Sequence, residues 1–391
     1  MKTLKEIDVK AKTVLVRCDY NVPTDENGAI TDDNRITATI ELIDYLLQQN
    51  ARIVLASHMG RPGGKKDPAL SLRPVAARLS ELISRKVAFA DDCIGDSVKE
   101  KVNALQEGEI LVLENLRFHE EEKKNDPRFA KELASLCDVY VNEAFAVSHR
   151  SQASVTGIPK YAPASGAGFL LEKEVRNYLD SVKNPVRPLI ALIGGAKVSG
   201  KLEALRNMLN YVDKLIIGGA MANTFLKARG IDTKGSMVED DLVDTAADIM
   251  RKAEENAIEI LLPVDLVAAD RFSKDAQTVK VPVDQIPAEW MGLDIGPKTA
   301  DRFAKALENA GTIVWNGPMG VFEMPAFMEG TRKVAEAVAR SGAFSIVGGG
   351  DTGLAVKMSG VSDSISFIST GGGAFLHMME GRELPGVTAL T

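Results

Sequence analysis

The sequence contains few cysteine, histidine and aromatic residues, and it has no long apolar run. Three cysteines and four histidines occur among its 391 residues, and aromatic residues make up 5%. Cys18, Cys93 and Cys137 are an odd number, lie far apart and lack metal-ligand spacing, so we expect buried, reduced thiols instead of disulfides or a zinc centre. No stretch approaches membrane-spanning length, and the N-terminus has no apolar signal region. We therefore expect a cytoplasmic protein with no membrane partner.

A surplus of basic residues is also missing. The 47 lysines and arginines are outnumbered by 54 aspartates and glutamates, and the formal net charge is -7. This balance argues against a general binder of nucleic acid or anionic membranes. Any bound anion must then be held by a local cluster of residues.

Glycines end four apolar runs in the second half of the chain. Each run stops at two or three glycines and resumes in a helix-like pattern; the glycines are Gly194-Gly195, Gly218-Gly219, Gly348-Gly349-Gly350 and Gly371-Gly372-Gly373. A strand that ends in this way exposes backbone N–H groups at a helix N-terminus, which favours an anion. One such end would be ordinary turn chemistry, but four on one parallel sheet predict a polyphosphate site.

Residues 195–201 satisfy the first part of the P-loop pattern, but Leu202 takes the place of the hydroxyl residue that binds magnesium. We therefore predict a glycine turn that leads into a helix whose first turns carry Lys197 and Lys201. Residues four apart share one helix face, so both ammonium groups would reach the same phosphates. The alternative is a pair of solvated surface lysines.

Polar side chains follow the apolar runs of the first half. They are Arg17, Asp19, Asn21, His58, Arg61, Arg117, Asn142, Glu143, His149 and Arg150. Open parallel sheets bind ligands beyond the carboxyl ends of their strands, so we expect these side chains along one edge. Taken singly, each arginine could form a surface ion pair, and the short polar residues could cap turns.

The length and a helical pattern near the middle predict two domains. Apolar residues recur at helical spacing from Phe169 to Val182, and Asn184-Pro185 ends the pattern. We expect an α/β protein with two Rossmann-like domains, each a mostly parallel sheet flanked by helices, joined by this hinge helix with a cleft between them. The expected bounds are 1–167 and 185–379 for the domains, 168–184 for the helix, and 380–391 for a C-terminal segment that packs back on the first domain.

Six motifs, in order along nearly the whole chain, resemble the phosphoglycerate kinase family. They are RCDYNVP at 17–23, HMGRP at 58–62, ENLRF at 114–118, GGAKVS at 194–199, WNGPMGVFE at 315–323 and GGGDT at 348–352. The resemblance implies a glycolytic enzyme that moves a phosphoryl group reversibly between ATP and the carboxylate of 3-phosphoglycerate, giving 1,3-bisphosphoglycerate and ADP. The family is usually monomeric.

By this resemblance, the first domain would bind 3-phosphoglycerate. Asp19 and Asn21 would hold its hydroxyl end, and Arg35 would lie beside the reacting carboxylate, where it offsets charge repulsion during transfer. The phosphate would be bound by His58, Arg61, Arg117 and Arg150, with Met59 and Gly60 of the same motif beside them. Arginine forks suit an acceptor that carries a carboxylate and a phosphate.

The second domain would bind the nucleotide. Lys197 would follow the transferred phosphoryl group, Lys201 would contact the phosphates, and Asp351 would bind the Mg²⁺ that accompanies ATP or ADP, unless it only caps a helix. Asn316 and Glu323 would hold the adenosine. Gly371, Gly372 and Gly373 would present N–H groups to the moving phosphate, so that with Arg35 and Lys197 they form the catalytic set. The other expected nucleotide contacts are Gly194, Gly195, Ala196, Gly218, Pro318, Gly349, Gly350 and Thr352.

A carboxylate acceptor needs no general base, so catalysis would rest on positioning and charge stabilisation after the domains close. Glu143, Ala146 and Gln152 depart from the residues usual in the family, which leaves the geometry of the loop before Arg150 open. A catalytically silent nucleotide-binding or scaffolding protein would be expected to lack Arg35, Lys197 or Asp351, and all three are present. A dinucleotide-dependent oxidoreductase would need a G-x-G-x-x-G turn after the first strand, which this sequence lacks.

Overall fold

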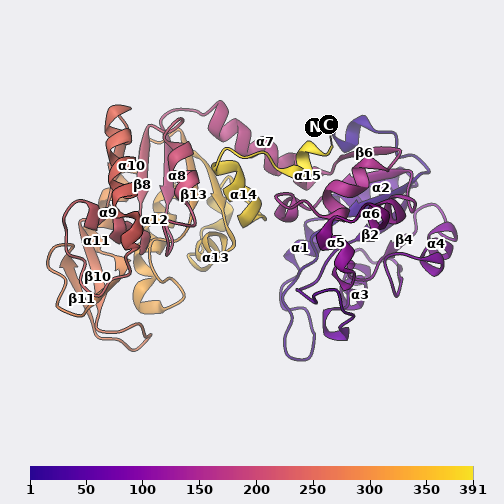
Figure 1. The fold of residues 1–391 in the computed structure, drawn as a ribbon, viewed down its shortest axis with the longest axis horizontal. Coiled ribbons are helices and arrows are strands. Elements are labelled where there is room, and N and C mark those ends of the chain that lie inside the picture. Colours follow the sequence, from indigo (N-terminus) through magenta and orange to yellow (C-terminus); the bar gives the residue numbers. More distant parts are fainter. Residues whose placement is uncertain (391) are drawn as a thin grey trace. The chain divides into compact units, whose positions relative to one another are not determined.

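The chain folds into two compact α/β units (Figure 1). The structure is a computed structural model that describes residues 1–390; Thr391, the last residue of the expected C-terminal segment, lies outside the described residues. Unit 1 comprises Met1–Val175 together with residues 383–390, and unit 2 comprises Arg176–Arg382. The boundary therefore falls inside helix α7 (Phe169–Lys183).

Unit 1 is built on a six-stranded sheet in which every pairing is parallel, with the strand order β3-β4-β2-β1-β5-β6. The central strands are almost entirely buried and apolar, as expected of strands that helices cover on both faces. The strands are β1 (Thr13–Arg17), β2 (Arg52–Ala56), β3 (Val87–Phe89), β4 (Ile110–Val112), β5 (Val139–Asn142) and β6 (Ala164–Ala167).

The helices of unit 1 are mostly short. They are α1 (Asn34–Thr37), α2 (Ile40–Gln48), α3 (Arg73–Leu82), α4 (Asp96–Asn103), α5 (Glu120–Lys124), α6 (Pro127–Ala134) and α15 (Pro385–Thr388), with the short turn η3 (Leu116–Phe118) before α5. Helix α6 shows why they start where they do: the Asp126 carboxylate accepts the backbone N–H groups of Arg128 and Phe129, and Pro127 occupies the first turn.

The C-terminal residues belong to unit 1. The backbone N–H of Gly386 in α15 donates to the carbonyl of Ser148 at 2.8 Å, and its carbonyl accepts from Asn142 Nδ2 at 3.3 Å. The N–H of Lys2 donates to the carbonyl of Leu390 at 3.2 Å. These bonds join both ends of the chain to the sheet of unit 1.

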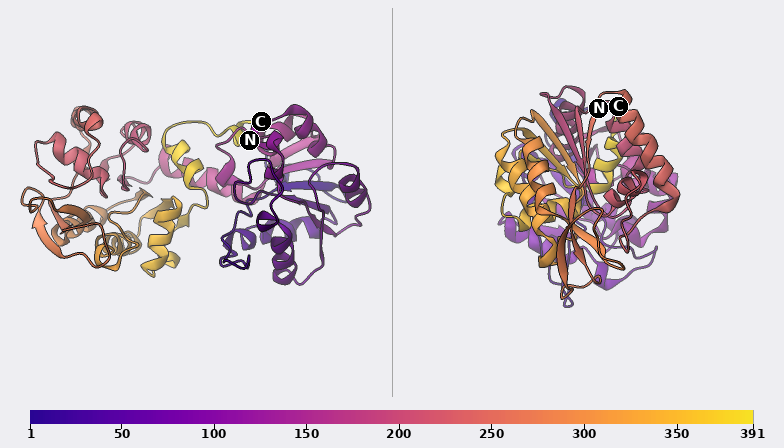
Figure 2. Two further views of the ribbon diagram at one scale, coloured as in Figure 1. Left: turned by 60° about the horizontal axis from the view of Figure 1, so that its bottom comes forward. Right: turned by 90° about the vertical axis from the view of Figure 1, so that its left-hand side faces the viewer.

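Unit 2 also has an all-parallel sheet of six strands, in the order β15-β14-β13-β7-β8-β9, and Figure 2 shows helices on both of its faces. Its strands are β7 (Leu189–Ile193), β8 (Lys214–Ile217), β9 (Glu259–Leu261), β13 (Thr312–Asn316), β14 (Phe344–Gly348) and β15 (Phe367–Ile368). Its helices are α8 (Leu202–Met208), α9 (Met221–Ala228), α10 (Val243–Glu255), α11 (Pro297–Leu307), α12 (Glu329–Arg340), α13 (Gly350–Met358) and α14 (Gly372–Met379). The predicted fold class, mostly parallel sheets flanked by helices, is confirmed.

Unit 2 contains a second sheet that the sequence did not predict. Three antiparallel strands, β10 (Asp265–Ala269), β11 (Thr278–Pro282) and β12 (Met291–Ile295), are arranged in the order β11-β10-β12. Strand β11 is only partly buried, and a register shift interrupts the pairing of β10 with β12. Strands β11 and β12 lack an uninterrupted apolar run, because Lys280 lies in the middle of β11 and Asp294 lies within β12.

Two of the expectations drawn from absences can be compared with the structure. Cys18, Cys93 and Cys137 are free and buried, as predicted. Within residues 1–390, none of the helices combines the length and the apolar character needed to cross a membrane.

Candidate functional site

Unit 1 gathers a cluster of ionisable side chains where its central strands end; we call Arg17, Arg35, His58, Arg117 and Arg150 the basic cluster. Arg17 is the last residue of β1, His58 follows β2, Arg117 lies in η3 after β4, and Arg35 comes from α1. Burial, and then the positive charges of Arg17, Arg117, Arg150 and Arg35, hold the pKa of His58 well below its usual range. His58 is therefore neutral at pH 7. The four guanidinium groups lie close enough for their positive charges to disfavour a second proton on its ring.

Arg17, which was expected at this edge of the sheet but was given no binding role, also belongs to this cluster. It is fully buried, its Nε donates to Ser154 Oγ at 2.7 Å, and one Nη donates to the carbonyl of Cys18. Its other Nη lies 3.2 Å from His58 Nδ1. The sequence placed Arg17 at the end of an apolar run and in the first motif, but neither signal indicated its contact with His58.

The predicted substrate residues around Asp19 form one hydrogen-bonded group. Arg35 forms an ion pair with Asp19 Oδ2, and His58 Nδ1 is 3.8 Å from Asp19 Oδ1. Asn21 Oδ1 accepts the backbone N–H of Gly60 at 2.8 Å. The structure thus brings the first and second motifs together.

Arg117 carries a hydrogen-bond donor that has no acceptor. One Nη donates to the carbonyl of Gly60 at 2.7 Å, whereas the other Nη is buried and has no partner among residues 1–390. Burial, reinforced by the charges of Arg17 and Arg150, lowers the pKa of Arg117 to about 10. A buried N–H without an acceptor destabilises a protein by about 1–3 kcal/mol, and more when the group is charged, so an anion bound here would relieve that cost.

A pocket of about 500 Å³ brings three predicted phosphate ligands together. Arg61, Arg117 and Arg150 line it, and so do Lys123 and Lys124 of α5. These two lysines were not predicted, because a run of charges on a short helix is ordinarily a solvated surface. The pocket has the volume and the charge to hold a small phosphate ester.

The departures from the family's usual residues have separate structural roles. Glu143 is buried, and its two carboxylate oxygens accept the backbone N–H of Leu170 at 3.0 Å in the first turn of α7. Gln152 is 5% exposed, lines the phosphate-sized pocket, and has an Oε1 without a hydrogen-bond partner among the described residues. Only Gln152 therefore faces the predicted site.

The glycine turns of unit 2 correct one part of the sequence prediction. The N–H groups of Gly194, Gly195 and Gly218 are not open to an anion, because each donates at 3.0 Å to a backbone carbonyl. The acceptors are the carbonyls of Asn316, Pro318 and Ile193. These bonds tie the ends of β7, β8 and β13 together, a tertiary arrangement that a glycine motif does not reveal.

The other two glycine turns each lead into a helix, although the N–H of Gly371 already donates to Ser369 Oγ at 3.3 Å, a bond that a phosphate would have to replace. Helix α13 follows Gly349, whose φ is 101°, and helix α14 follows Gly371. The first N–H groups of an α-helix have no partner inside the helix. A Cβ on Gly372 would lie only 3.1 Å from the Cα of Gly349, so the two turns pack backbone against backbone. Together they form one place where several helix N-terminal N–H groups gather.

Lys197 and Lys201 do not lie in the first turns of a helix as predicted. Helix α8 begins at Leu202, so both residues precede it and do not share a helix face. Lys201 Nζ donates to the carbonyls of Gly194 at 2.6 Å and Asn316 at 3.0 Å. Desolvation, opposed by the charge of Asp351, lowers the pKa of Lys201 to about 8. Lys197 is exposed, so only Lys197 matches the alternative of a solvated lysine.

The end of β13 is fixed by side chains of the predicted set. Asn316 Nδ2 donates to the carbonyl of Gly348 at 2.9 Å, and Thr352 Oγ1 accepts the N–H of Gly317 at 2.7 Å. Gly317 has a φ of 99°, and a Cβ there would collide with the carbonyl oxygen of Gly194. Asp351 lies exposed in the first turn of α13, but the N-cap is Gly349, so the alternative that Asp351 is an N-cap residue is wrong.

A pocket of about 870 Å³ in unit 2 combines polar and apolar walls. Five predicted nucleotide residues line it: Gly195, Ala196, Pro318, Glu323 and Asp351. Its apolar walls include Leu266, Met291, Leu293, Ile295, Met319 and Val321, several of which come from the antiparallel sheet. Sequence reasoning missed this sheet, and it therefore missed the apolar surface on which a flat ring could lie.

Comparisons with known proteins agree with these observations. The profile of the phosphoglycerate kinase family matches residues 4–382. The phosphoglycerate kinase of Desulforapulum autotrophicum is 63% identical over 390 residues, which cover 100% of both chains. That of Desulfosudis oleivorans is 54% identical over 390 residues, covering 100% of this chain and 98% of the relative.

Solved structures agree as well. The structure of phosphoglycerate kinase from Coxiella burnetii has a TM-score of 0.91 and 42% identity, with 99% of this chain and 98% of that chain covered. The enzyme from Pyrococcus horikoshii OT3 has a TM-score of 0.86 and 34% identity, with 100% and 98% covered. The chain therefore belongs to the phosphoglycerate kinase family.

Proposed function

We propose a division of labour for the phosphoryl transfer between ATP and 3-phosphoglycerate that this family catalyses in glycolysis: unit 1 binds the acceptor and unit 2 binds the nucleotide. The observation that carries this proposal is the buried Nη of Arg117, which lacks an acceptor and lies beside a pocket lined by Arg61 and Arg150. A site of this kind is complete only with an anion. The silent nucleotide-binding alternative is not favoured.

In unit 1, the phosphate of 3-phosphoglycerate would bind to Arg61, Arg117 and Arg150, which offer forked donors. Neutral His58 can donate or accept one hydrogen bond without adding charge, and Met59 and Gly60 shape the segment beside it. Asp19 and Asn21 would hold the hydroxyl end. Arg35, which is paired with Asp19, would turn toward the reacting carboxylate and offset the repulsion between two anions.

In unit 2, the base would lie on the apolar wall of the larger pocket, and Glu323 would bind the ribose. The N–H groups at Gly349, Gly350 and Gly371–Gly373 would face the phosphates, and Lys197 and Lys201 would add positive charge. The turns built by Gly194, Gly195, Ala196, Gly218, Asn316, Pro318 and Thr352 would support these donors.

Asp351 would hold the Mg²⁺ that accompanies ATP or ADP. Its carboxylate is exposed and lines the pocket, and Mg²⁺ in nucleotide sites typically uses one or two carboxylates together with phosphate oxygens. When bound, the ion neutralises part of the phosphate charge. The donors of this chain then have only to orient the phosphates.

Transfer between the two units requires that they close on each other and exclude water, since the acceptor and donor groups belong to different units. Arg35, Lys197 and the N–H groups of Gly371–Gly373 would stabilise the charge of the moving group. A single chain supplies both sets of residues, so we propose a monomer. We also propose a cytoplasmic location, because the three buried, free thiols suit a reducing compartment. Small-angle scattering should show compaction when both substrates are present; an unchanged radius would contradict closure.

The activity test measures ADP formation by the purified chain with magnesium and ATP, with and without 3-phosphoglycerate, beside Lys197→Ala. We expect turnover that requires 3-phosphoglycerate and falls sharply in the variant. ATP binding without any turnover would instead favour a silent binding protein, and turnover with another carboxylate would change the acceptor.

A further inference from the structure

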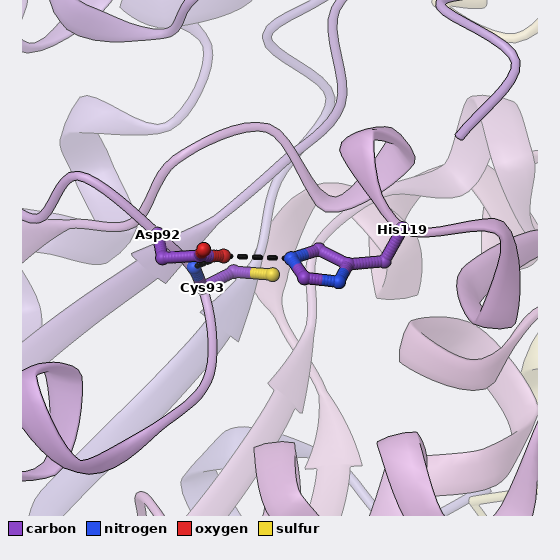
Figure 3. A group of neighbouring side chains, drawn as sticks. All are labelled: Asp92, Cys93 and His119. Atoms are coloured by element: carbon purple, nitrogen blue, oxygen red, sulfur yellow. Dashed lines mark hydrogen bonds and ion pairs between the residues drawn. The ribbon is translucent and has the colours of Figure 1, made fainter. Parts of the chain in front are cut away.

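Beside the phosphate-sized pocket of unit 1, which His119 also lines, three side chains converge that are all of metal-ligating types (Figure 3). Asp92, Cys93 and His119 each offer one ligand atom, and these atoms all lie within 4.8 Å of one another. Asp92 and Cys93 belong to the loop between β3 and α4, whereas His119 lies 27 residues further on, between η3 and α5. No metal motif in the sequence marks them, because the fold alone brings them together.

The geometry argues against a catalytic thiol. His119 Nε2 lies 2.6 Å from Asp92 Oδ1, and Figure 3 shows the Cys93 sulfur on the same side of the ring. In a nucleophilic Cys-His-Asp arrangement, the carboxylate and the thiol face opposite ring nitrogens, so that the ring can take up a proton from the thiol. Cys93 is also fully buried, out of reach of a substrate. Three different donor atoms that face one point are instead the arrangement of a cation site.

We propose that Asp92 Oδ1, Cys93 Sγ and His119 Nε2 bind a divalent transition-metal ion of borderline softness, such as Zn²⁺. Oxygen, nitrogen and sulfur are the donors that Zn²⁺ uses in proteins, at about 2.0–2.3 Å. Small movements of three side chains would bring the donors to that distance. The side chains of His119 and Asp92 are 22% and 30% exposed, so water can complete a four-coordinate site.

Binding of the ion exchanges protons in a balanced way. The Cys93 S–H bond breaks, an S–metal bond forms, and the proton passes to water. The Nε2–H bond of His119, which donates to Asp92, also breaks; this proton passes through water to Nδ1, so that the ring stays neutral and the Nε2 lone pair faces the metal. No oxidant or reductant takes part.

The charges around the three ligands both support and oppose binding. Burial raises the pKa of the Cys93 thiol well above its usual range and opposes the thiolate, whereas the nearby negative charges of Glu122 and Glu114 favour a cation. Lys66 opposes it, because its Nζ lies 2.8 Å from Asp92 Oδ2. The Lys66 side chain is 61% exposed and contacts the oxygen that the metal does not need, so it can move away.

The site would join the loop after β3 to the segment after η3. Arg117 lies in η3, but it is held independently, by the carbonyl of Gly60 and the side chain of Asn115. We therefore expect the metal to stabilise unit 1; because His119 also lines the phosphate-sized pocket, turnover does not serve as the readout. The readout is thermal stability together with the spectrum of the metal itself.

The experiment titrates the full, reduced chain with Co²⁺, which replaces Zn²⁺ and absorbs visible light. We expect one Co²⁺ ion to bind with intense bands typical of four-coordination and a thiolate-to-cobalt charge-transfer band, and Zn²⁺ to displace it. Cys93→Ser should lose the charge-transfer band, and His119→Gln should bind at least about tenfold more weakly. Cys137→Ser, a buried cysteine outside the cluster, is the matched control and should behave like the wild type.

Two further comparisons keep the result clear. Lys66→Ala removes the competing cation and should tighten binding several-fold, which a merely structural cluster would not do. Asp351→Asn should keep the charge-transfer band, because the nucleotide site offers no thiolate. Zn²⁺ should raise the melting temperature of the wild type and of Cys137→Ser, but not that of Cys93→Ser.

The proposal fails if the wild type shows no thiolate band, if the band persists in Cys93→Ser, or if Lys66→Ala binds Co²⁺ no more tightly. If Cys93→Ser proves unfolded by circular dichroism, the wild-type spectrum and His119→Gln decide the question. In that case, His119→Gln that binds Co²⁺ as tightly as the wild type overturns the assignment.

Discussion

The buried carboxyl group of Glu143 should make the stability of unit 1 depend on pH. Its oxygens accept the N–H of Leu170 at the start of α7, but burial dominates and raises the pKa of Glu143 from 4.5 to about 8; the charge of Glu41 acts in the same direction. The folded chain therefore keeps a proton on this group between pH 4.5 and 8 that the unfolded chain releases. Because the folded state binds more protons, the free energy of unfolding falls as pH rises through this window.

The size of the effect follows from the shift. One pKa unit corresponds to about 1.4 kcal/mol, so unit 1 should lose roughly 3 kcal/mol between pH 4.5 and 7 and roughly 5 kcal/mol by pH 8. Glu143→Gln keeps an oxygen that can accept the N–H of Leu170 but removes the titrating group. The variant should match the wild type near pH 5 and be several kcal/mol more stable at pH 8.

Urea unfolding at pH 5, 6, 7 and 8 would measure this difference. Both tryptophans, Trp290 and Trp315, belong to unit 2, so their fluorescence follows that unit, whereas circular dichroism follows both. Asp294→Asn is the matched control, since burial raises the pKa of Asp294 in unit 2 to about 8 as well. Asp294→Asn should reduce the pH dependence of the unfolding followed by fluorescence, whereas Glu143→Gln should leave that dependence unchanged and reduce only the one followed by circular dichroism. Equal pH slopes for Glu143→Gln and the wild type would show that Glu143 is ionised in the folded chain and would refute the reasoning.

Four further predictions test the proposed sites. Arg35→Ala should lower turnover by about 10³-fold or more while ATP affinity, measured by calorimetry, stays within about twofold; an equal loss of ATP binding would move Arg35 out of the acceptor site. Asp351→Ala should weaken magnesium-ATP binding at least about tenfold and leave 3-phosphoglycerate binding unchanged in the same titrations, and the reverse order would refute the metal assignment. Arg117→Met should raise the KM for 3-phosphoglycerate about 10–100-fold in steady-state assays, and an unchanged KM would contradict the phosphate site. Gly317→Ala should lower the free energy of unfolding of unit 2, followed by tryptophan fluorescence, by more than about 2 kcal/mol. Gly342→Ala, where φ is also positive but the space is open, should lower it by about 1 kcal/mol, and equal losses would show that the contact with the Gly194 carbonyl is relieved.

The sequence predicted the parts of the fold that are local. The central parallel strands β1, β2 and β7 follow from uninterrupted apolar runs, and the spacing from Phe169 to Val182 anticipated helix α7. The antiparallel sheet β10–β12 was missed because β11 is partly exposed, charged residues interrupt β11 and β12, and the pairing of β10 with β12 is irregular. Its side chains form much of the apolar wall of the larger pocket. Because the sheet was not predicted, this apolar wall was not predicted either.

The predicted residues were mostly brought together, but their roles in the hydrogen-bond network could not be read from motifs. Gly194, Gly195 and Gly218 donate to neighbouring strand ends and leave no N–H for an anion. Lys201 is used in the same way, as a donor to two backbone carbonyls. A motif indicates which residue types a turn contains, whereas the acceptors of these donors lie on other strand ends, and those of Gly194 and Gly195 are more than a hundred residues away.

The two predicted binding regions differ in how much they destabilise the protein when no ligand is bound. The Arg117→Met prediction rests on that difference. In unit 2 the donors of Gly194, Gly195 and Lys201 are already satisfied by carbonyls. In unit 1, four arginines repel one another around His58, and one Nη of Arg117 has no acceptor. An anion removes both penalties at once, so inorganic phosphate should raise the melting temperature of the wild type. Arg117→Met should be no less stable than the wild type without phosphate and should gain less from it, because the variant has lost the unsatisfied donor along with the ligand for the anion.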